Sequence, residues 1–341
     1  MEESAINISR SLVVWSLIGA TLILAAGATR VVVVPMLMRL PADFESHGVY
    51  TGSVTTPNPA GATTVDVEID RSVRVVQVDG NTAVVRSNSQ MFGIPRGPAL
   101  STEQHTFALD RTTLRQAEAP RGAEVEDQHG AITFSLPPHP AHDGYTYYDA
   151  ATRTTQPLVF AEEATFHGRK VLHYTADGNA PLADPAKVRT AIAQRFGGDG
   201  SSIPASAVAT LGMPVPNQPL PERIPLELRS HLQLDVLADK QFGTPVRLQQ
   251  TTTLTAVPIG LPAGAPITLS ISKLASRDDS SADAVDKLNS VETKLRLVSW
   301  WLPGGAALAG IALITFALLR IRTGRISPAG ADRPVERALS E

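Results

Sequence analysis

The chain has 341 residues, 43% of them hydrophobic and 18% charged, and its formal net charge is −3. This balance gives no electrostatic reason to expect nucleic-acid binding, which needs a concentrated basic surface. The sequence has no cysteine, which excludes disulfides, thiolate metal sites and cysteine nucleophiles.

The first predicted element is an apolar helix near the N-terminus. Residues 11–29 carry no charge, and a helix with a rise of about 1.5 Å per residue comes close to spanning the roughly 30 Å hydrocarbon core of a bilayer over that length. We therefore expect a transmembrane helix over residues 11–34. Arg30 is placed at the membrane interface, and residues 1–10 are expected in the cytoplasm.

A cleaved signal peptide is the alternative interpretation of this segment. Ala26-Gly27-Ala28 fits a small-x-small cleavage site. Glu2 and Glu3 favour the uncleaved helix, because a signal peptide begins with a basic region. The apolar run is also long for a signal peptide.

Residues 41–200 are predicted to form a β-rich sub-domain outside the membrane. Apolar and acidic side chains alternate strictly over residues 65–70, as expected of a strand with one buried face. Residues 79–81, Asp-Gly-Asn, then predict a turn and a first hairpin. Further strands are expected at 106–109, 113–116, 145–149, 156–161 and 170–175.

One soluble helix is predicted at residues 185–196. Asp184 is a good N-cap, and Gly197 fits just past the C-terminal end. A proline-rich segment, residues 201–225, follows and is interpreted as a seam between two sub-domains. The alternative is a long surface loop that wraps a single domain.

The second β sub-domain is expected over residues 226–296. Leucines at alternate positions open this segment, and strands at 248–257 and 267–271 follow. A helix is predicted at 281–297, where apolar residues line one side and acidic residues stand four positions before basic ones.

Residues 298–319 are predicted to form a second transmembrane helix, continuous with the helix before it. The segment has no charge and is long enough to span a bilayer. Aromatic residues at its start and arginines after its end mark the interfaces, and the arginines place the tail, residues 320–341, in the cytoplasm. The expected interfacial residues are Trp300, Trp301, Arg320, Arg322 and Arg325. Two spans then leave both termini in the cytoplasm and the β-rich region outside the plasma membrane.

Small residues at helical spacing occur in both apolar segments: Gly305 with Ala309, Ala306 with Gly310, and Ser16 with Ala20. Such spacing lets membrane helices approach closely. The alternative is that alanine and glycine are simply frequent in this sequence. In total, the elements predict an α+β protein, with an antiparallel β-rich exported domain flanked by an N-terminal and a C-terminal transmembrane helix.

The sequence carries none of the serine-hydrolase, zinc-protease, Walker or dinucleotide motifs. His139, His142 and Asp143 lie in a proline-broken loop, which favours solvated side chains over a metal site. Glu162 and Glu163 are adjacent, so on a strand they point to opposite faces and do not form an acid/base pair. We expect no cofactor, no metal and no enzymatic activity.

Tyr145, Tyr147, Tyr148 and Asp149 are the candidate ligand-binding residues. On a strand, Tyr145 and Tyr147 share one face and Tyr148 takes the other. We expect one face in the core and the other at a partly exposed rim, with Tyr147 in the core and Tyr148 at the rim. The exposed face is the one that would stack on a sugar or line a lipid groove. Asp149 is typical of a residue that begins a turn.

The block from Tyr145 to Tyr174 resembles a known family. Its motif is Tyr147-Tyr148-Asp149, then Pro157, Phe160, the pair Glu162-Glu163, Gly168 and Tyr174. With an apolar segment near each end of the chain, this pattern resembles the actinobacterial porin PorA family of membrane proteins, whose domain has no assigned function. The chain departs from the family's aromatic pattern, since its exported domain contains no tryptophan.

The resemblance implies a cell-envelope protein of mycolic-acid-containing bacteria, linked to lipomannan maturation and lipoarabinomannan synthesis and without an assigned catalytic residue. We expect a non-enzymatic accessory protein whose partners are the lipid bilayer and a glycolipid or a membrane glycosyltransferase. One alternative is a glycan-modifying enzyme with a site dispersed over the sheet. A second is an oligomeric channel, which ranks lower because a porin needs a closed barrel with an apolar lipid-facing band.

Overall fold

A computed structural model gives the fold of residues 10–29, 31, 36, 38–58, 61–210, 220–260 and 266–324. The chain divides into a larger compact unit, Met38–Asn289, and a smaller unit formed by Met1–Leu37 and Ser290–Glu341. The interfacial positions expected at Arg30 and Arg325 lie outside the described residues, as do the side chains of Arg320 and Arg322.

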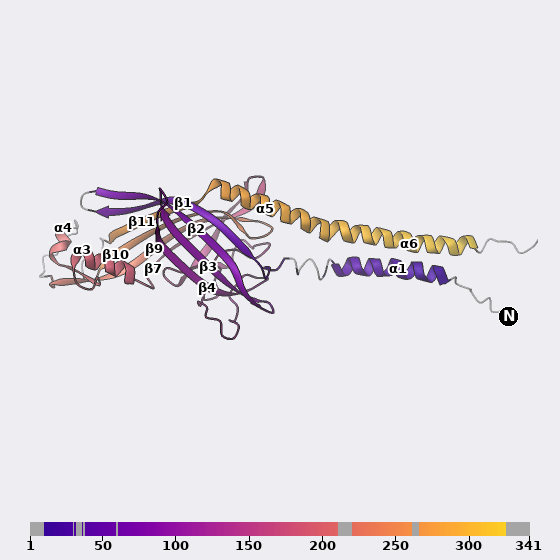
Figure 1. Cartoon of the computed structure of the whole chain (residues 1–341), viewed down its shortest axis with the longest axis horizontal. Helices are drawn as coiled ribbons and strands as arrows, with labels where there is room; N and C mark the ends of the chain where they lie inside the picture. The colour runs from indigo at the N-terminus through magenta and orange to yellow at the C-terminus, as the bar shows by residue number, and fades with distance from the viewer. Residues whose placement is uncertain are drawn as a thin grey trace, which may run out of the picture. The chain divides into compact units, whose positions relative to one another are not determined.

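Eleven strands of the described residues join one sheet in the larger unit (Figure 1). Their bounds are β1 (Glu45–Asn58), β2 (Gly61–Asp79), β3 (Thr82–Gly93), β4 (Ala99–Asp110), β5 (Tyr145–Asp149), β6 (Thr154–Phe166), β7 (Arg169–Pro181), β8 (Ser202–Pro204), β9 (Arg223–Asp239), β10 (Pro245–Pro258) and β11 (Ile267–Ser276). These strands all pair antiparallel. The predicted antiparallel β-rich domain is therefore confirmed.

The strand order is β4-β3-β2-β1-β11-β10-β9-β7-β6-β5, with β8 paired to β9. Strands from either side of the proline-rich segment are neighbours, because β7 pairs with β9 and β1 pairs with β11. The expected division into sub-domains 41–200 and 226–296 is therefore corrected, since main-chain hydrogen bonds cross it twice. Within the expected seam, residues 211–219 lie outside the described residues.

The described helices are α1 (Arg10–Ala28), α3 (Ala186–Phe196), α4 (Ser206–Thr210), α5 (Asp278–Arg296) and α6 (Leu302–Gly324), with a short π-helical stretch at Leu297–Trp301. The predicted helix at 185–196 is confirmed by α3, where the Asp184 carboxylate accepts the Ala186 N–H at 3.2 Å. Gly197 ends it with a φ of 71°. α5 starts at Asp278, before the predicted residue 281.

One helix among the described residues is long and apolar enough to cross a membrane, the helical run Asp278–Leu319. It contains the predicted span at 298–319, and Trp300 and Trp301 are exposed at its start, as an interfacial aromatic belt requires. The apolar part described for α1, Leu17–Ala28, is shorter than a membrane span needs. The first predicted span is therefore not established at its full length.

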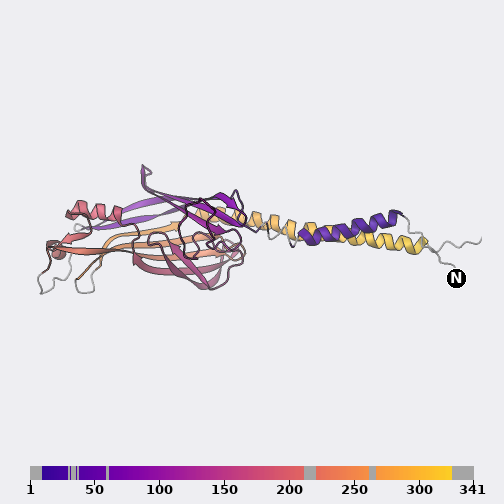
Figure 2. The same cartoon turned by 90° about the horizontal axis from the view of Figure 1, so that it is seen from below.

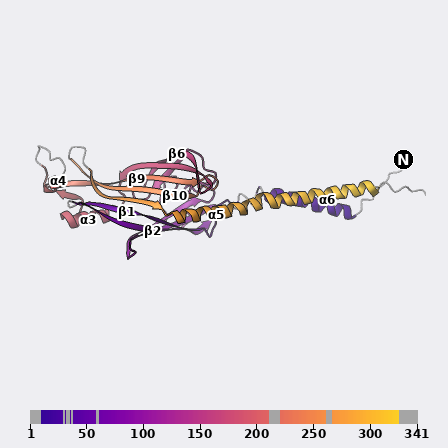
Figure 3. The same cartoon turned by 90° about the horizontal axis from the view of Figure 1, so that it is seen from above.

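The sheet curls so that its two halves face each other. Figure 2 shows the strands in two layers, and Figure 3 shows β1 and β2 on one side with β6 and β9 on the other. β5 lies between the layers, because Tyr145 packs in the cluster on β6, β7 and β9 and Tyr148 packs in the cluster on β2, β3 and β4. In β9 the buried residues occupy alternate positions from Ile224 to Ala238, which confirms the predicted period of two. We call the face that carries these residues the inner face of the sheet.

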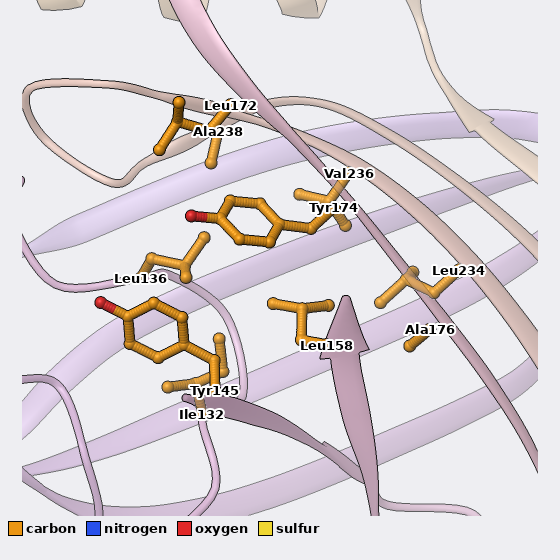
Figure 4. Close-up of a cluster of buried hydrophobic side chains, with 10 residues drawn as sticks. All are labelled: Ile132, Leu136, Tyr145, Leu158, Leu172, Tyr174, Ala176, Leu234, Val236 and Ala238. Atoms are coloured by element: carbon orange, nitrogen blue, oxygen red, sulfur yellow. The ribbon is translucent and has the colours of Figure 1, made fainter. Parts of the chain in front are cut away.

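An apolar cluster fills the inner face of β6, β7 and β9 (Figure 4). Tyr174 is fully buried there, and Tyr145 and Phe160 meet its ring edge-on, with ring centroids 6.4 and 5.8 Å away. Ala141 joins two of the rings: its N–H donates to the Tyr145 hydroxyl (3.0 Å), and its carbonyl accepts from the Tyr174 hydroxyl (2.6 Å). Burial raises the pKa of Tyr174, so this hydroxyl stays a donor.

A second apolar cluster lies on the inner face of β2, β3 and β4 and includes Tyr148 from β5. The main chain of Ile132 forms a parallel bridge with Tyr147 along one edge of β5, donating to the Thr146 carbonyl and accepting from the Tyr148 N–H at 2.9 Å each. Earlier in the same connecting segment, Ala117 donates to Ala108 of β4 at 2.9 Å. The predicted strand at 113–116 is reduced to this irregular pairing with the edge of β4.

A third cluster caps the inner face at the other end of β9. Ile192 of α3, Ile203 of β8 and Val208 of α4 pack there against Leu226 and Leu228. The inner face of β9 is thus covered by packed apolar side chains near both of its ends.

α5 packs on the outer face of the sheet. Val285 and Leu288 of α5 contact Val171 of β7 and Val246 of β10 in a fourth apolar cluster. The apolar side of α5 is therefore buried against the sheet.

A buried ion pair lies beside this contact. Arg169 Nε donates to Asp239 Oδ2 at 2.6 Å, and the two side chains are 8% and 1% exposed. Arg169 Nη1 also donates to Asn289 Oδ1 of α5 at 2.7 Å. Asp239 Oδ1 accepts the N–H groups of Gln241 and Phe242 at 3.0 and 2.8 Å. One carboxylate therefore links β7, the β9–β10 turn and α5.

In the smaller unit, α1 and α6 approach closely at two glycines. A Cβ added at Gly19 would lie 2.7 Å from the Gly310 carbonyl oxygen, and one added at Gly310 would lie 2.6 Å from that of Gly19. The predicted small-residue contact is confirmed at Gly310, whereas Gly305 has no such neighbour within 4 Å. Only glycine allows this backbone separation.

We expect Asp239→Ala to destabilise the larger unit by about 3–5 kcal/mol, because it leaves the Arg169 charge buried without its partner. Asp235→Ala is the matched control, since Asp235 pairs with His173 at 2.8 Å but is 43% exposed; its cost should be below about 1 kcal/mol. Thermal unfolding of the detergent-solubilised chain, followed by circular dichroism, measures both. Equal losses of stability in the two variants would contradict the structural role assigned to the buried Arg169–Asp239 pair.

The α1–α6 contact predicts that a side chain at Gly310 disrupts the packing of the two helices, because its Cβ would lie 2.6 Å from the Gly19 carbonyl oxygen. Gly310→Val should therefore lower the thermal midpoint of the smaller unit, measured by differential scanning calorimetry of the detergent-solubilised chain. Gly305→Val is the matched control, since Gly305 has no neighbouring atom within 4 Å. Equal effects of the two variants would show that the contact is not specific.

Candidate functional site

The predicted site residues on β5 fall into separate environments. Tyr145 is a core residue of the cluster in Figure 4, and its hydroxyl is held by the Ala141 N–H. As predicted, Tyr145 and Tyr147 share one face of the strand and Tyr148 takes the other. Tyr145 is therefore part of the fold and is not offered to a ligand.

Tyr148 is 2% exposed and packs edge-on against Phe107, with ring centroids 6.0 Å apart. Its hydroxyl donates to Glu126 Oε2 at 3.5 Å, and His105 Nδ1 lies 2.8 Å from the other oxygen of Glu126. Burial raises the pKa of Tyr148, and the charge of Glu126 adds to this. The expectation of an exposed rim at Tyr148 is corrected: β5 lies between two layers, so both of its faces are covered.

Tyr147 is half-buried and packs against the apolar cluster that contains Tyr145 and Tyr174. Burial raises its pKa; the charge of Arg71 opposes this, while Asp149 and Tyr50 add to it. Arg71, Asp149 and Tyr50 are thus near enough to Tyr147 to act on its pKa. Among the described residues, no hydrogen-bond partner is found for the Tyr147 hydroxyl.

Asp149 is buried and serves the turn after β5, as predicted. Its Oδ2 accepts from the Thr152 hydroxyl at 2.8 Å, and its Oδ1 accepts the Ala151 N–H at 3.1 Å. Burial raises the pKa of Asp149, and these hydrogen bonds act in the opposite direction. Its oxygens are engaged within the turn.

A second candidate surface lies on the central strands. β1 and β11 contain no fully buried residue among those described, although each is paired on both sides. Cross-strand register places their inward residues in line with those of β9 and β10. The half-buried inward residues are Val54, Gln250, Thr252, Leu254, Ser272 and Leu274, and we call them the central inner surface.

Two serine hydroxyls on the inner face are buried without a partner among the described residues. They are Ser272 Oγ of β11 and Ser230 Oγ of β9. Buried hydroxyls are normally hydrogen-bonded, so such exceptions indicate places where water or a ligand supplies the partner. The inner face of the central strands thus combines apolar side chains with unsatisfied polar atoms.

The remaining polar candidates lie elsewhere. His142 stacks on Phe160 with ring centroids 4.1 Å apart, and Glu163 pairs with Lys240 at 2.7 Å. Glu162 lies instead 3.9 Å from His173, so the two glutamates do not cooperate. Across the described ranges, no group of three or more histidine and acidic side chains is arranged to hold a metal.

Sequence reasoning missed Arg71, Tyr50 and the central inner surface. The available signal was the alternation of leucine or isoleucine with serine in β11, and of arginine with apolar residues in β2. Periodicity identifies which residues share a face of a strand. It does not predict which strands have an inner face that other side chains fail to bury.

Comparison with known proteins finds no curated relative of this chain. Among solved structures it is similar to an outer membrane lipoprotein-sorting protein domain from Vibrio parahaemolyticus, with 8% identity, a TM-score of 0.18, and coverage of 72% of this chain and 87% of that one. It is also similar to a thioesterase II from Thermobifida fusca YX, with 14% identity, a TM-score of 0.11, and coverage of 72% and 86%. Scores this low support no statement about fold or function.

The sequence matches the family described as Porin PorA over residues 13–319. The match includes most of α1, the whole sheet and most of α6. Because it covers most of the 341 residues, this chain belongs to the Porin PorA family.

Proposed function

We propose that this chain is a non-enzymatic membrane protein of the cell envelope, whose β-rich domain binds an amphiphilic lipid or glycolipid at the central inner surface. By holding such a molecule, or by presenting it to a membrane glycosyltransferase, the domain would assist lipid handling or lipoglycan maturation. Membership of the Porin PorA family and the one membrane-length helix support the envelope assignment.

The incomplete packing of β1 and β11 carries the proposal. A central strand of a sheet is normally buried on at least one face, and burial of an apolar side chain contributes about 1.5–3 kcal/mol. Val54, Leu254 and Leu274 face inward yet remain half-exposed. An acyl chain would cover them, and a polar headgroup would serve hydroxyls such as that of Ser272.

The outer face of the sheet argues against a membrane-embedded pore formed by these strands. A transmembrane barrel presents an apolar band to lipid. Here the outer face carries Glu68 and Asp70 of β2, and Asp177 and Asp235 pair with histidines across β7 and β9. These charges favour water on the outside of the sheet.

An enzyme with a dispersed site is the second candidate. Glycoside chemistry uses two carboxylates flanking the scissile bond. The carboxylates closest to the β5 tyrosines are already engaged, Asp149 by Thr152 and Glu126 by His105. The binding function is therefore preferred.

We further propose that α1 and α6 both span the plasma membrane, with the larger unit outside and both termini inside. The Gly19–Gly310 approach supports this, since helices that pack this closely occupy the same depth of the bilayer. The arginines that follow residue 319 supply the orientation.

Lipid binding predicts that a chain purified in mild detergent carries a co-purifying amphiphile detectable by native mass spectrometry. Leu274→Gln should reduce the lipid-bound fraction several-fold, because it places a polar group on the central inner surface. Ile271→Gln is the matched control, since Ile271 lies on the same strand with its side chain on the opposite face. An equal effect of both variants, or no bound lipid in the parent chain, would contradict the proposal.

Topology is tested with single cysteines in this cysteine-free chain. Arg121→Cys, at an exposed position, should react with a membrane-impermeant maleimide in intact cells. Ser340→Cys should react only after permeabilisation. Labelling of Ser340→Cys in intact cells would place the C-terminus outside and refute the proposed orientation.

A further inference from the structure

We infer that Arg71, together with the hydroxyls of Tyr50 and Tyr147, forms a binding site for an anionic group, a phosphate or a carboxylate. The inference deepens the proposed function and rests on it, because it assigns the charge class of the ligand's headgroup. The site joins side chains from β1, β2 and β5 on the inner face of the sheet.

Arg71 points inward from β2. It shares a strand face with Val67 and Val73, which are both buried, and its Nε donates to Ser87 Oγ of β3 at 3.3 Å. Ser87 is itself buried. The guanidinium is thus held on the inner face by one nitrogen, while Nη1 and Nη2 find no hydrogen-bond partner among the described residues.

Tyr50 lies diagonally across from Arg71. Cross-strand register pairs Tyr50 with Ile69 and Gly48 with Arg71, so Tyr50 and Arg71 are diagonal neighbours on the same face. A Cβ added at Gly48 would lie 3.5 Å from the Tyr50 hydroxyl, which places that hydroxyl over the residue opposite Arg71. The glycine leaves room there that a side chain would fill.

Tyr147 of β5 is half-buried, and it is near enough to Arg71 and Tyr50 for both to act on its pKa, Arg71 lowering it and Tyr50 raising it against a background of burial. Neither tyrosine hydroxyl has a hydrogen-bond partner in the parts of the chain that are described. The Tyr50 hydroxyl and the two free ends of the guanidinium share the inner face of β1 and β2, with the Tyr147 phenol within range of the Arg71 charge.

Arg71 has no acidic partner among the described residues. No ion pair within the described ranges includes Arg71, in contrast with Arg169, whose carboxylate partner lies at 2.6 Å. Asp149 acts on the pKa of Tyr147, but burial raises the pKa of Asp149 and its oxygens are engaged by the turn. A half-buried cation without a counter-ion is costly, so the site is suited to an anion that arrives with the ligand.

The donor set defines the ligand chemistry. A guanidinium binds phosphate and carboxylate through two parallel hydrogen bonds, and hydrogen bonds to charged groups are stronger than those between neutral groups. An uncharged sugar or a glycerol headgroup would leave the guanidinium without a counter-ion. The site should therefore select an anionic amphiphile over a neutral one with the same acyl chains.

The test uses the full chain in a neutral detergent and measures binding by isothermal titration calorimetry. The probes are dioctanoyl phosphatidic acid, dioctanoylglycerol and inorganic phosphate. We expect the parent chain to bind the phosphatidic acid at least about tenfold more tightly than the diacylglycerol, since charged hydrogen bonds contribute this much. Arg71→Gln should abolish that preference. Arg74→Gln, on the exposed outer face of the same strand, should keep it.

Tyr147→Phe provides a second variant that keeps the ring and removes only the hydroxyl. It should lower the preference by about threefold, the loss of one modest hydrogen bond, and it carries the test if Arg71→Gln fails to fold. Competition by inorganic phosphate would identify a site that accepts free phosphate. Its failure to compete, with the preference still lost in Arg71→Gln, would identify a lipid headgroup as the source.

Two results would overturn the inference. In the first, the parent chain binds both amphiphiles equally, which leaves the proposed lipid-binding function standing and removes the anion site. In the second, Arg71→Gln retains the full preference of the parent chain. If instead neither amphiphile binds but phosphate binds in an Arg71-dependent manner, the proposed function fails and the anion site stands.

Discussion

The ion pair between Arg169 and Asp239 is the interaction on which the placement of α5 depends. Removing two charges from water costs several kcal/mol each, and only close geometry with further hydrogen bonds offsets this. Asp239 meets that condition through the N–H groups of Gln241 and Phe242, and Arg169 reaches Asn289 of α5. Because the pair is specific in direction, it holds α5 at one position where the apolar contacts of Val285 and Leu288 alone would allow sliding.

The second organising feature is the position of β5. A short strand that lies between two layers must bury both faces, which explains why three nearby tyrosines do not behave alike. Tyr145 and Tyr148 enter separate apolar clusters, and Tyr147 is left half-buried beside Arg71. Arg169 on the outer face is paired with Asp239, whereas Arg71 on the inner face has no ion-pair partner among the described residues.

Much of the fold could be predicted from the sequence because it rests on local patterns. The alternation in β9, the Asp-Gly-Asn turn between β2 and β3, and the helix after Asp184 all have short-range causes. The two-sub-domain interpretation failed because the pairing of β1 with β11 joins residues far apart in the chain, and no local pattern encodes it. The exposure expected for Tyr148 was wrong for the same reason: period two gives the faces of β5, but its position between two layers decides their burial.

The β1–β11 pairing also has a consequence for the order of folding. The register begins with Tyr50 opposite Ser276, so the centre of the sheet is assembled from the first and the last of the described strands. During synthesis, β1–β4 can form hairpins early, since their partners are consecutive. β1 then presents an open edge until β11 emerges, and long-range pairing of this kind is slow and exposed to wrong partners. Until β11 pairs, the sheet therefore consists of two halves, β1–β4 and β5–β10, and the edges of β1 and β10 are open to pairing with other chains.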